Sequence, residues 1–251
     1  MKRTLALGDV HGAHKALKQV LEKSSFDKEE DRLIFLGDIV DGWSESYECV
    51  EELLTIKNLI TIKGNHCDWF IKWINTGIHP DGWRQGGYTT LQSYCKHLDK
   101  DCVNTLFDNW TTNLLRTDLP RKHIEFFMNM QDFYIQDNKC FVHGGFDRME
   151  SIYTQSSEFI YYWDRELWRK AQSCVIGQKL QTIDQFDEIF IGHTTTESSY
   201  PDLKPVNCGR VWNLDQGAGW GGKLTLMDVN TKEYWQSDIV STLYPDEKGK
   251  R

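Results

Sequence analysis

The sequence predicts an α/β protein in which central mixed β-sheets are flanked by helices and a helical cap is inserted into the chain. Three observations support this fold class. Short apolar runs of strand length recur, amphipathic helical patterns separate the first of them, and each run is followed within two residues by glycine or histidine. Alternating strands and helices favour a parallel-containing sheet that helices cover.

Five short apolar runs are expected to form buried strands. They are residues 4–7, 33–36, 59–62, 140–142 and 189–191. The turns that follow them carry polar and imidazole side chains. In open α/β sheets the ligand crevice lies beyond the carboxyl ends of the strands, so these five turns should converge there.

Other segments follow from periodicity and composition. Residues 14–23 and 45–54 have helical patterns, with Ser44 as the candidate N-cap of the second helix. The strand signal fades over residues 69–135, where a Trp-rich helical pattern broken by glycine and proline predicts the inserted cap. A hairpin is expected from residues 223–229 and 233–236. The polar tail, 245–251, is expected to be frayed, which leaves one domain over residues 1–244.

Bulk properties limit the function classes. The net charge is −8 and no long Lys/Arg run is present, so a nucleic-acid polymer is not an expected partner. No apolar stretch resembles a secretory leader or a membrane span. Seven cysteines are scattered without close pairs and are expected to be reduced thiols. We therefore expect a cytoplasmic protein without a membrane partner, and the sequence indicates no oligomeric state.

The turns after the five strands supply side chains suited to two hard divalent cations, which bind oxygen and imidazole donors. Asp38 offers a carboxylate that can bridge both ions. The spacing does not assign the other side chains to one ion or the other. The candidate metal ligands are Asp9, His11, Asp38, Asn65, His143 and His193.

The motifs GDVHG, GDIVDG, GNH, VHGG and GHT, in that order, resemble the signature blocks of the phosphoprotein phosphatase branch of the calcineurin-like metallophosphoesterases. The resemblance is to the bacterial and phage serine/threonine phosphatases in particular, and it implies a calcineurin-like β-sandwich. It also implies a first metal on Asp9, His11, Asp38 and His193, and a second on Asp38, Asn65 and His143. Manganese is expected, with iron or zinc as alternatives.

The expected mechanism follows from charge. Two cations lower the pKa of a shared water and produce a hydroxide that attacks phosphorus. His66 is the candidate proton donor to the leaving group, and Asp41 is the candidate residue that orients its imidazole. The resemblance implies the same pairing. Asp41 could equally cap the helix that begins near Ser44.

Phosphate oxygens also need cationic partners. The related eukaryotic pattern places an arginine directly after the residue that matches Asp41, but this chain has Gly42 there. Arg165 resembles the later phosphate-binding arginine of the bacterial and phage members. Arg84, which precedes a segment resembling the bacterial branch, is a second candidate, and Asn65 is expected to contact phosphate as well.

Three functions remain in view. The resemblance favours a serine/threonine protein phosphatase-like phosphomonoesterase that acts on a phosphorylated protein or a small phosphoester. The alternative is a bis(5'-nucleosyl)-tetraphosphatase, which would use the same ions against a phosphoanhydride. A non-catalytic phosphate-binding module is the third, and the complete ligand set argues against it.

Overall fold

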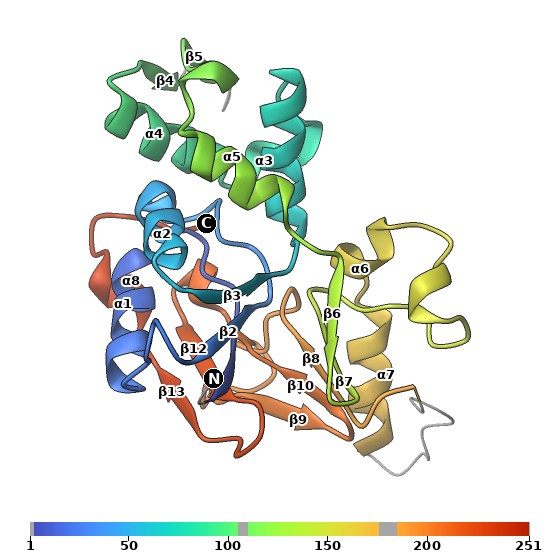
Figure 1. Ribbon diagram of the computed structural model, residues 1–251. Helices are drawn as coiled ribbons and strands as arrows, with labels where there is room; N and C mark the ends of the chain where they lie inside the picture. Colours follow the sequence, from blue (N-terminus) through green and yellow to red (C-terminus); the bar gives the residue numbers. More distant parts are fainter. Residues whose placement is uncertain (1–2, 105–109, 176–184, 251) are drawn as a thin grey trace.

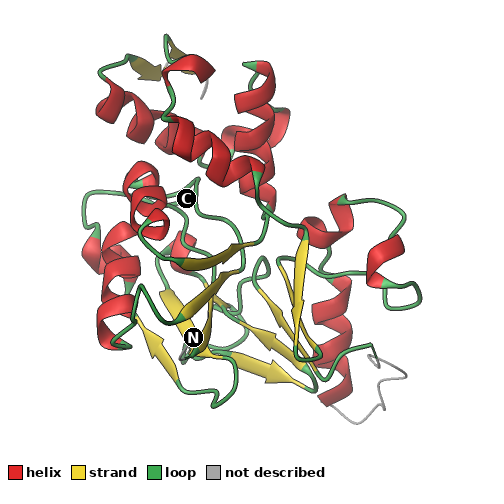
Figure 2. Ribbon diagram, viewed as in Figure 1, coloured by secondary structure: helices red, strands yellow, loops and turns green. Residues whose placement is uncertain are grey.

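In the computed structural model, which describes residues 3–104, 110–175 and 185–250, two β-sheets pack face to face beneath a cap (Figures 1 and 2). The first sheet has the order β11-β12-β1-β2-β3, and β13 pairs with β12. Its strands are β1 (Thr4–Leu7), β2 (Arg32–Phe35), β3 (Asn58–Thr61), β11 (Asp215–Gln216), β12 (Lys223–Asp228) and β13 (Tyr234–Gln236). Strands β1, β2 and β3 are parallel, and β12 runs antiparallel to β1.

The second sheet has the order β6-β7-β8-β10-β9, with parallel pairing of β7 to β8 and of β8 to β10. Its strands are β6 (Phe133–Gln136), β7 (Lys139–Val142), β8 (Glu188–Ile191), β9 (Val206–Cys208) and β10 (Val211–Asn213). The described helices are α1 (His14–Lys23), α2 (Ser46–Leu54), α3 (Asn65–Thr76), α4 (Gly87–Leu98), α5 (Arg121–Met128), α6 (Phe159–Trp163), α7 (Glu166–Val175) and α8 (Val240–Leu243), with 3-10 turns η1 (Asp81–Arg84), η2 (Arg116–Asp118), η3 (Ile152–Thr154) and η4 (Ala218–Trp220).

The core follows the two-residue alternation of the strands. Ala6 and Ile34 point into the space between the sheets, where they meet Phe141 and Phe190 of the second sheet. Leu5, like the other odd-numbered residues of β1, faces the core shared with α1 and α2 instead. The predicted α/β class with mixed sheets and flanking helices is therefore confirmed.

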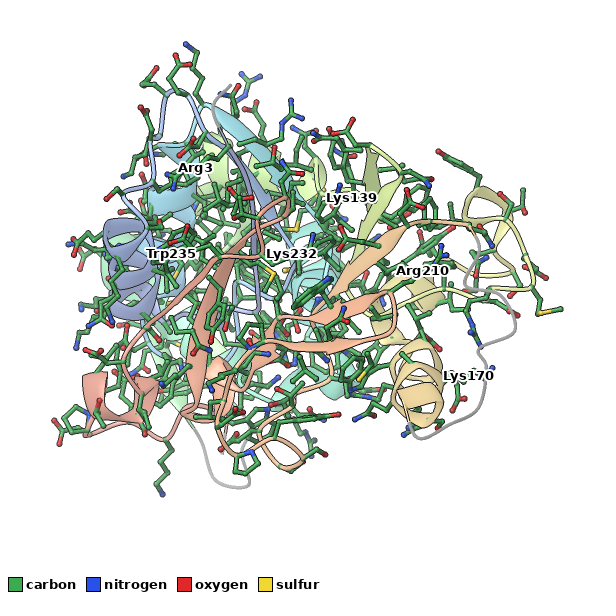
Figure 3. The ribbon with its side chains drawn as sticks, turned by 90° about the horizontal axis from the view of Figure 1, so that it is seen from below. Arg3, Lys139, Lys170, Arg210, Lys232 and Trp235 are labelled. Carbon is green, nitrogen blue, oxygen red and sulfur yellow. The ribbon has the colours of Figure 1, made fainter. Side chains whose placement is uncertain are left out.

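The two sheets are also tied together on the side opposite the cap, which Figure 3 shows from below. Lys232, in the turn between β12 and β13 of the first sheet, forms an ion pair of 2.7 Å with Glu188 on β8 of the second. On the same view Arg3 lies near Trp235, with the guanidinium 5.9 Å from the ring centre. Arg3 also pairs with the buried Asp31.

No helix in the described part of the chain is long and apolar enough to cross a membrane.

The cap consists of α3, η1, α4 and α5 together with a two-stranded hairpin, β4 (Cys102–Asn104) and β5 (Trp110–Thr112) (Figure 1). An aromatic cluster fills it, in which Phe70 packs against Trp73, Trp83 and Tyr94. The hairpin was not predicted. Its two strands have three residues each, which is too short for alternation to show.

Two expectations, one for the C-terminal segment and one for Ser44, are wrong. The segment Pro245–Lys250 is not frayed, because it is hydrogen-bonded to the body at Glu247 and at Lys250. Ser44 does not cap α2, since its hydroxyl donates to the Glu247 carboxylate over 2.7 Å. The residue before the helix is Glu45, which makes no side-chain capping bond. The Ser44 hydroxyl thus bonds to a residue that is distant in sequence, whereas the local pattern predicted that it would cap the helix.

Candidate metal centre

The six candidate ligands lie together at the carboxyl ends of five strands. Asp9 and His11 follow β1, and Asp38 follows β2. Asn65 begins α3 directly after β3, His143 follows β7, and His193 follows β8. All six are buried. The sandwich therefore brings residues from both sheets to one place.

A first group of donors forms around Asp38. Its Oδ2 lies 3.7 Å from Nε2 of His11, and that nitrogen lies 3.8 Å from Oδ2 of Asp9. The other ring nitrogen of His11 makes a 2.9 Å bond with the Val40 carbonyl, which fixes the ring orientation. Candidate atoms of His66 also fall within 4.8 Å of those of His11 and Asp38.

A second group shares the same carboxylate. Oδ2 of Asp38 lies 3.3 Å from Nε2 of His143. Oδ1 of Asn65 is 3.2 Å from that nitrogen and 2.9 Å from Nδ1 of His193. The geometry thus differs from the grouping implied by the resemblance, because His193 lies with Asn65 and His143 rather than with Asp9 and His11. Its backbone N–H, however, donates to Asp9.

The turns that hold these groups adopt unusual backbone conformations. His11, Asp38, Asp41 and His193 have φ values of 49°, 56°, 66° and 64°, in the left-handed region that non-glycine residues rarely adopt. Each such residue costs about 1–3 kcal/mol, which the surrounding structure must offset. Gly192 permits a close approach, since a Cβ there would lie 2.1 Å from Oδ1 of Asp9. The backbone therefore aims these side chains inward at a cost to stability.

The charges in the cluster are poorly balanced. Burial, together with Asp215 and Asp38 nearby, raises the pKa of Asp9 well above its usual value. Burial alone would raise the pKa of Asp38 too, but the adjacent His143 and His66 rings lower it well below its usual value. Burial would lower the pKa of His143, yet Asp38 and Asp9 raise it to about 9. The nearby carboxylates thus favour the charged form of the His143 imidazole, whereas burial opposes it.

The donor set fits a pair of divalent cations. Its donor atoms are carboxylate and amide oxygens and ring nitrogens, and Asp38 is common to both groups. Nε2 of His193 is buried without a hydrogen-bond partner in the described part of the chain. A buried ring nitrogen without a partner is costly, but the His193 nitrogen that lies among the second group of donors is Nδ1, so the fit to cations rests on the donor set as a whole. The residues present are therefore able to hold metal.

His66 and Asp41 form a hydrogen-bonded pair beside the cluster. Nδ1 of His66 lies 2.9 Å from Oδ2 of Asp41, and both side chains are buried. Burial raises the pKa of Asp41 to about 8, although bonds from Thr90 and Trp83 lower it. Burial lowers the pKa of His66 to about 3, against the opposing effect of Asp38. Burial thus disfavours the charged forms of both side chains, which remain joined by the Nδ1–Oδ2 hydrogen bond.

The cap holds this pair, which the sequence did not indicate. The indole nitrogen of Trp83 donates to both carboxylate oxygens of Asp41 at 3.0 Å, and the Thr90 hydroxyl donates to Oδ1 at 2.5 Å. The Asp41 backbone N–H in turn donates to the Thr90 oxygen at 2.9 Å. No local signal marks these partners, because they lie more than forty residues from Asp41 in sequence.

The two candidate phosphate arginines differ in position. Nη1 of Arg165 lies 3.3 Å from the His193 carbonyl and 3.2 Å from the Thr194 hydroxyl, so the guanidinium borders the cluster. Arg84 is exposed at the end of η1 on the cap. None of the contacts that the structure describes joins it to the metal ligands. Its neighbour Trp83 reaches the site instead.

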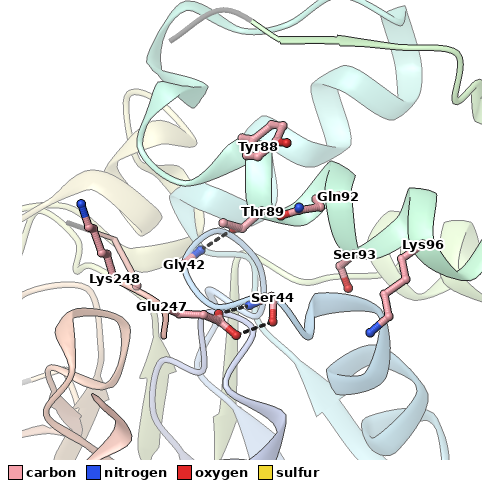
Figure 4. A pocket seen from close by; sticks show the side chains of 10 residues that line it. Gly42, Ser44, Tyr88, Thr89, Gln92, Ser93, Lys96, Glu247 and Lys248 are labelled. Carbon is pink, nitrogen blue, oxygen red and sulfur yellow. Dashed lines mark hydrogen bonds between the residues drawn. The ribbon is translucent and has the colours of Figure 1, made fainter. Parts of the chain in front are cut away.

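A groove lies between the cap and the segment Pro245–Lys250 (Figure 4). Its volume is about 870 Å³. The lining residues are Gly42, Ser44, Tyr88, Thr89, Gln92, Ser93, Lys96, Glu247, Lys248 and Gly249. At its floor the Gly42 N–H donates to the Thr89 hydroxyl, and Glu247 accepts from Ser44, as drawn in Figure 4. Among these lining residues Gly42 follows Asp41 in sequence, whereas the six candidate ligands and the His66–Asp41 pair do not line the groove.

Comparison with known proteins defines the class. The family model for calcineurin-like phosphoesterases matches residues 2–197, and the chain belongs to this family. It is therefore a metallophosphoesterase, a phosphoric ester hydrolase rather than a non-catalytic binding module.

Individual relatives point to a narrower group. The chain is 36% identical to a symmetrical bis(5'-nucleosyl)-tetraphosphatase of Actinobacillus succinogenes, over 94% of this chain and 97% of the relative. It is 32% identical to the enzyme of the same name from Coxiella burnetii, over 96% and 94% of the two chains. A serine/threonine phosphatase structure from Saccharomyces cerevisiae matches with a TM-score of 0.54 and 15% identity, covering 99% of this chain and 82% of that one. The last similarity is one of fold.

Proposed function

We propose that this chain hydrolyses small phosphoric anhydrides and esters, with symmetrical dinucleoside tetraphosphates as the preferred substrates. The observation that carries the proposal is the buried set of six donors, and a groove with lysine side chains that includes Gly42, the residue after Asp41, supports it. The names of the full-length relatives support it. This choice puts the dinucleotide hydrolase ahead of the protein phosphatase that the motifs alone favoured.

Two divalent cations are proposed to bind here, with Asp38 bridging them. The first would be held by Asp9, His11 and Asp38, and the second by Asp38 with Asn65, His143 and His193. Manganese suits this mixture of nitrogen and oxygen donors. When bound, the cations would activate water and neutralise charge on the phosphoryl group.

The protein's own side chains would donate a proton to the leaving oxygen and bind the phosphate oxygens. We assign His66 as the donor to the leaving oxygen through Nε2, with Asp41 orienting the ring through Nδ1. Arg165, beside His193, would bind phosphoryl oxygens. Arg84, exposed on the cap, is a candidate contact for the outer phosphates of a long substrate.

The groove supports a polyphosphate substrate. Lys96 and Lys248 line the groove. Glu247 also lines it, and its carboxylate accepts hydrogen bonds from Ser44. A tetraphosphate carries several negative charges, so it gains more from such lysines than a single phosphate does. Tyr88 adds an aromatic ring to the lining, which suits contact with a nucleobase. The volume of about 870 Å³ is within the usual range for small-molecule sites.

The second candidate is a phosphomonoesterase of the protein-phosphatase type. It rests on the five turn motifs, because the same ligands and proton donor serve any leaving group.

A substrate panel separates the two. Metal-stripped protein would be restored with one ion at a time and assayed on diadenosine tetraphosphate, p-nitrophenyl phosphate and a phosphoserine peptide. We expect the largest kcat/KM on the dinucleotide with manganese restored. A phosphopeptide preferred to diadenosine tetraphosphate would reverse the assignment, and no hydrolysis of any of the three with any ion would end it.

A further inference from the structure

The segment Pro245–Lys250 is anchored beside the metal centre at two points. Glu247 accepts hydrogen bonds from the backbone N–H and the hydroxyl of Ser44, at 3.0 and 2.7 Å. The Lys250 backbone N–H donates to the Gly219 carbonyl over 2.9 Å. Figure 1 shows this end of the chain beneath the cap, next to α2. The anchors place the Lys250 side chain beside the cluster.

Lys250 reaches into the site itself. Its Nζ lies 2.8 Å from Nε2 of His66 and 3.4 Å from Nε2 of His11. The side chain is partly buried. After burial, its positive charge is a further cause that lowers the pKa of His11. No other lysine makes a described contact with these two histidines.

Two glycines make room for the stem of this lysine. A Cβ on Gly219 would lie 2.8 Å from Cδ of Lys250, and a Cβ on Gly42 would lie 3.4 Å from its Cγ. A Cβ on Gly42 would also lie 2.8 Å from the His11 carbonyl oxygen. Position 42, where an arginine was expected, therefore has no room for a side chain, and the Lys250 stem occupies the adjacent space.

The position of Nζ defines what it can touch. A proton donor must lie within hydrogen-bond reach of the leaving oxygen, so a scissile phosphate has to lie close to Nε2 of His66. An ammonium group 2.8 Å from that nitrogen is within reach of the same phosphate. Arg165 borders the cluster near His193, from a different element. A phosphate bound to the cluster would therefore have one cationic side chain from each of two separate segments.

We propose that Lys250 is a substrate-binding residue whose ammonium group contacts the oxygens of the phosphate undergoing hydrolysis. This inference rests on the proposed function and adds a phosphate contact that the motifs do not contain. Without substrate the ammonium donates to Nε2 of His66, which leaves the Nδ1 proton for Asp41. The flexible lysine stem allows Nζ to turn to a bound phosphate, and Nε2 then takes up a proton from solvent, which it can give to the leaving oxygen.

Inorganic phosphate provides a test that does not require turnover. Its affinity for the full-length, manganese-loaded protein would be measured by calorimetry for the wild type, Lys250→Ala, Lys250→Arg and the surface control Lys57→Ala. Removing a charged hydrogen-bond donor should weaken phosphate binding about 10-fold in Lys250→Ala. Lys250→Arg should retain most of the affinity, and Lys57→Ala should match the wild type. The metal content of all four should be equal.

Kinetics with the substrate panel supply the second readout. We expect Lys250→Ala to raise KM for diadenosine tetraphosphate about 10-fold, with a smaller change in kcat. Phosphate affinity unchanged in Lys250→Ala would overturn the inference, and so would faster turnover, which would indicate that the lysine obstructs the site. In a third outcome, the wild type hydrolyses none of the substrates while Lys250→Ala weakens phosphate binding. This result would contradict the proposed function but support the Lys250 contact.

Discussion

The turns that carry the candidate metal ligands and the proposed proton-donor pair lie close together, yet they are held in different ways. Asp9, Asp38 and His193 are aimed inward by strand ends and left-handed turns of the two sheets. Asp41, by contrast, is held by hydrogen bonds from Trp83 and Thr90 of the cap. The comparison teaches that backbone geometry positions the candidate metal ligands, whereas packing of the cap positions the proposed proton-donor pair. The two functions should therefore be separable by mutation.

The largest effect is expected from Asp38→Asn. This carboxylate is common to both donor groups, and the amide cannot supply the negative charge that a bridging ligand needs. We expect the variant to bind fewer than two manganese ions per chain and to lose turnover. Elemental analysis after gel filtration gives the stoichiometry.

The matched control for this variant is Asp31→Asn, which alters another buried carboxylate, one that pairs with Arg3 away from the metal centre. It should retain both ions. Two ions per chain in Asp38→Asn would show that this carboxylate does not bridge.

A smaller effect is expected from His66→Asn. If His66 donates a proton and is not a ligand, metal content stays at the wild-type value while kcat falls by about 10²–10⁴-fold. The loss should be greatest for substrates with poor leaving groups, which depend most on protonation. Metal content and kcat would be measured on the same preparation.

His97→Asn is the control, because His97 lies on α4 and bonds to the Ser93 carbonyl instead. Loss of an ion from His66→Asn would place the ring among the ligands, as its distance from His11 and Asp38 allows.

Trp83→Phe tests the role of the cap in the same pair. The substitution keeps an aromatic ring but removes the indole donor to Asp41. Hydrogen bonds to charged groups contribute about 1.5–3 kcal/mol, part of which Thr90 retains, so kcat should fall about 10-fold. Metal content should not change.

Trp73→Phe, in the same aromatic cluster, controls for packing and should lower stability without this loss of kcat. Equal effects of the two substitutions on kcat would remove the distinction between positioning and packing.

The smallest effect concerns stability alone. Burial would raise the pKa of Asp31, but the bond and charge of Arg3 lower it below its usual value. A lowered carboxyl pKa stabilises the fold above the unfolded-state pKa of about 3.9, and the contribution is lost as pH falls through the folded-state value. Urea unfolding should therefore show a stability loss below about pH 4 that is shallower in Asp31→Asn. An identical acid profile in both proteins would contradict the role of this ion pair.

The sequence predicted the body of the fold better than the cap. Strand β1 and helix α1 begin and end where their patterns predicted, because β1 is a continuous buried apolar run and α1 has one buried face. The hairpin β4–β5 was missed because three-residue strands carry no periodicity.

Contacts within the candidate site divide in the same way. The convergence of Asp9, Asp38 and His143 follows from their places at strand ends. The contacts of Trp83 with Asp41 and of Lys250 with His66 join residues 42 and 184 positions apart, and no local pattern encodes them. The grouping of His193 with Asn65 likewise depends on how the second sheet packs against the first.

The indole bond from Trp83 to Asp41 also bears on how product leaves. If the cap swung away from the body, it would break that bond and the one from Thr90, and so disable the proton donor at every turnover. The cap is therefore expected to stay fixed on the body and not to open and close during turnover. Substrate and product should then pass along the groove beside Tyr88 and Lys96. Crosslinking the cap to the body should leave the rate of product release unchanged.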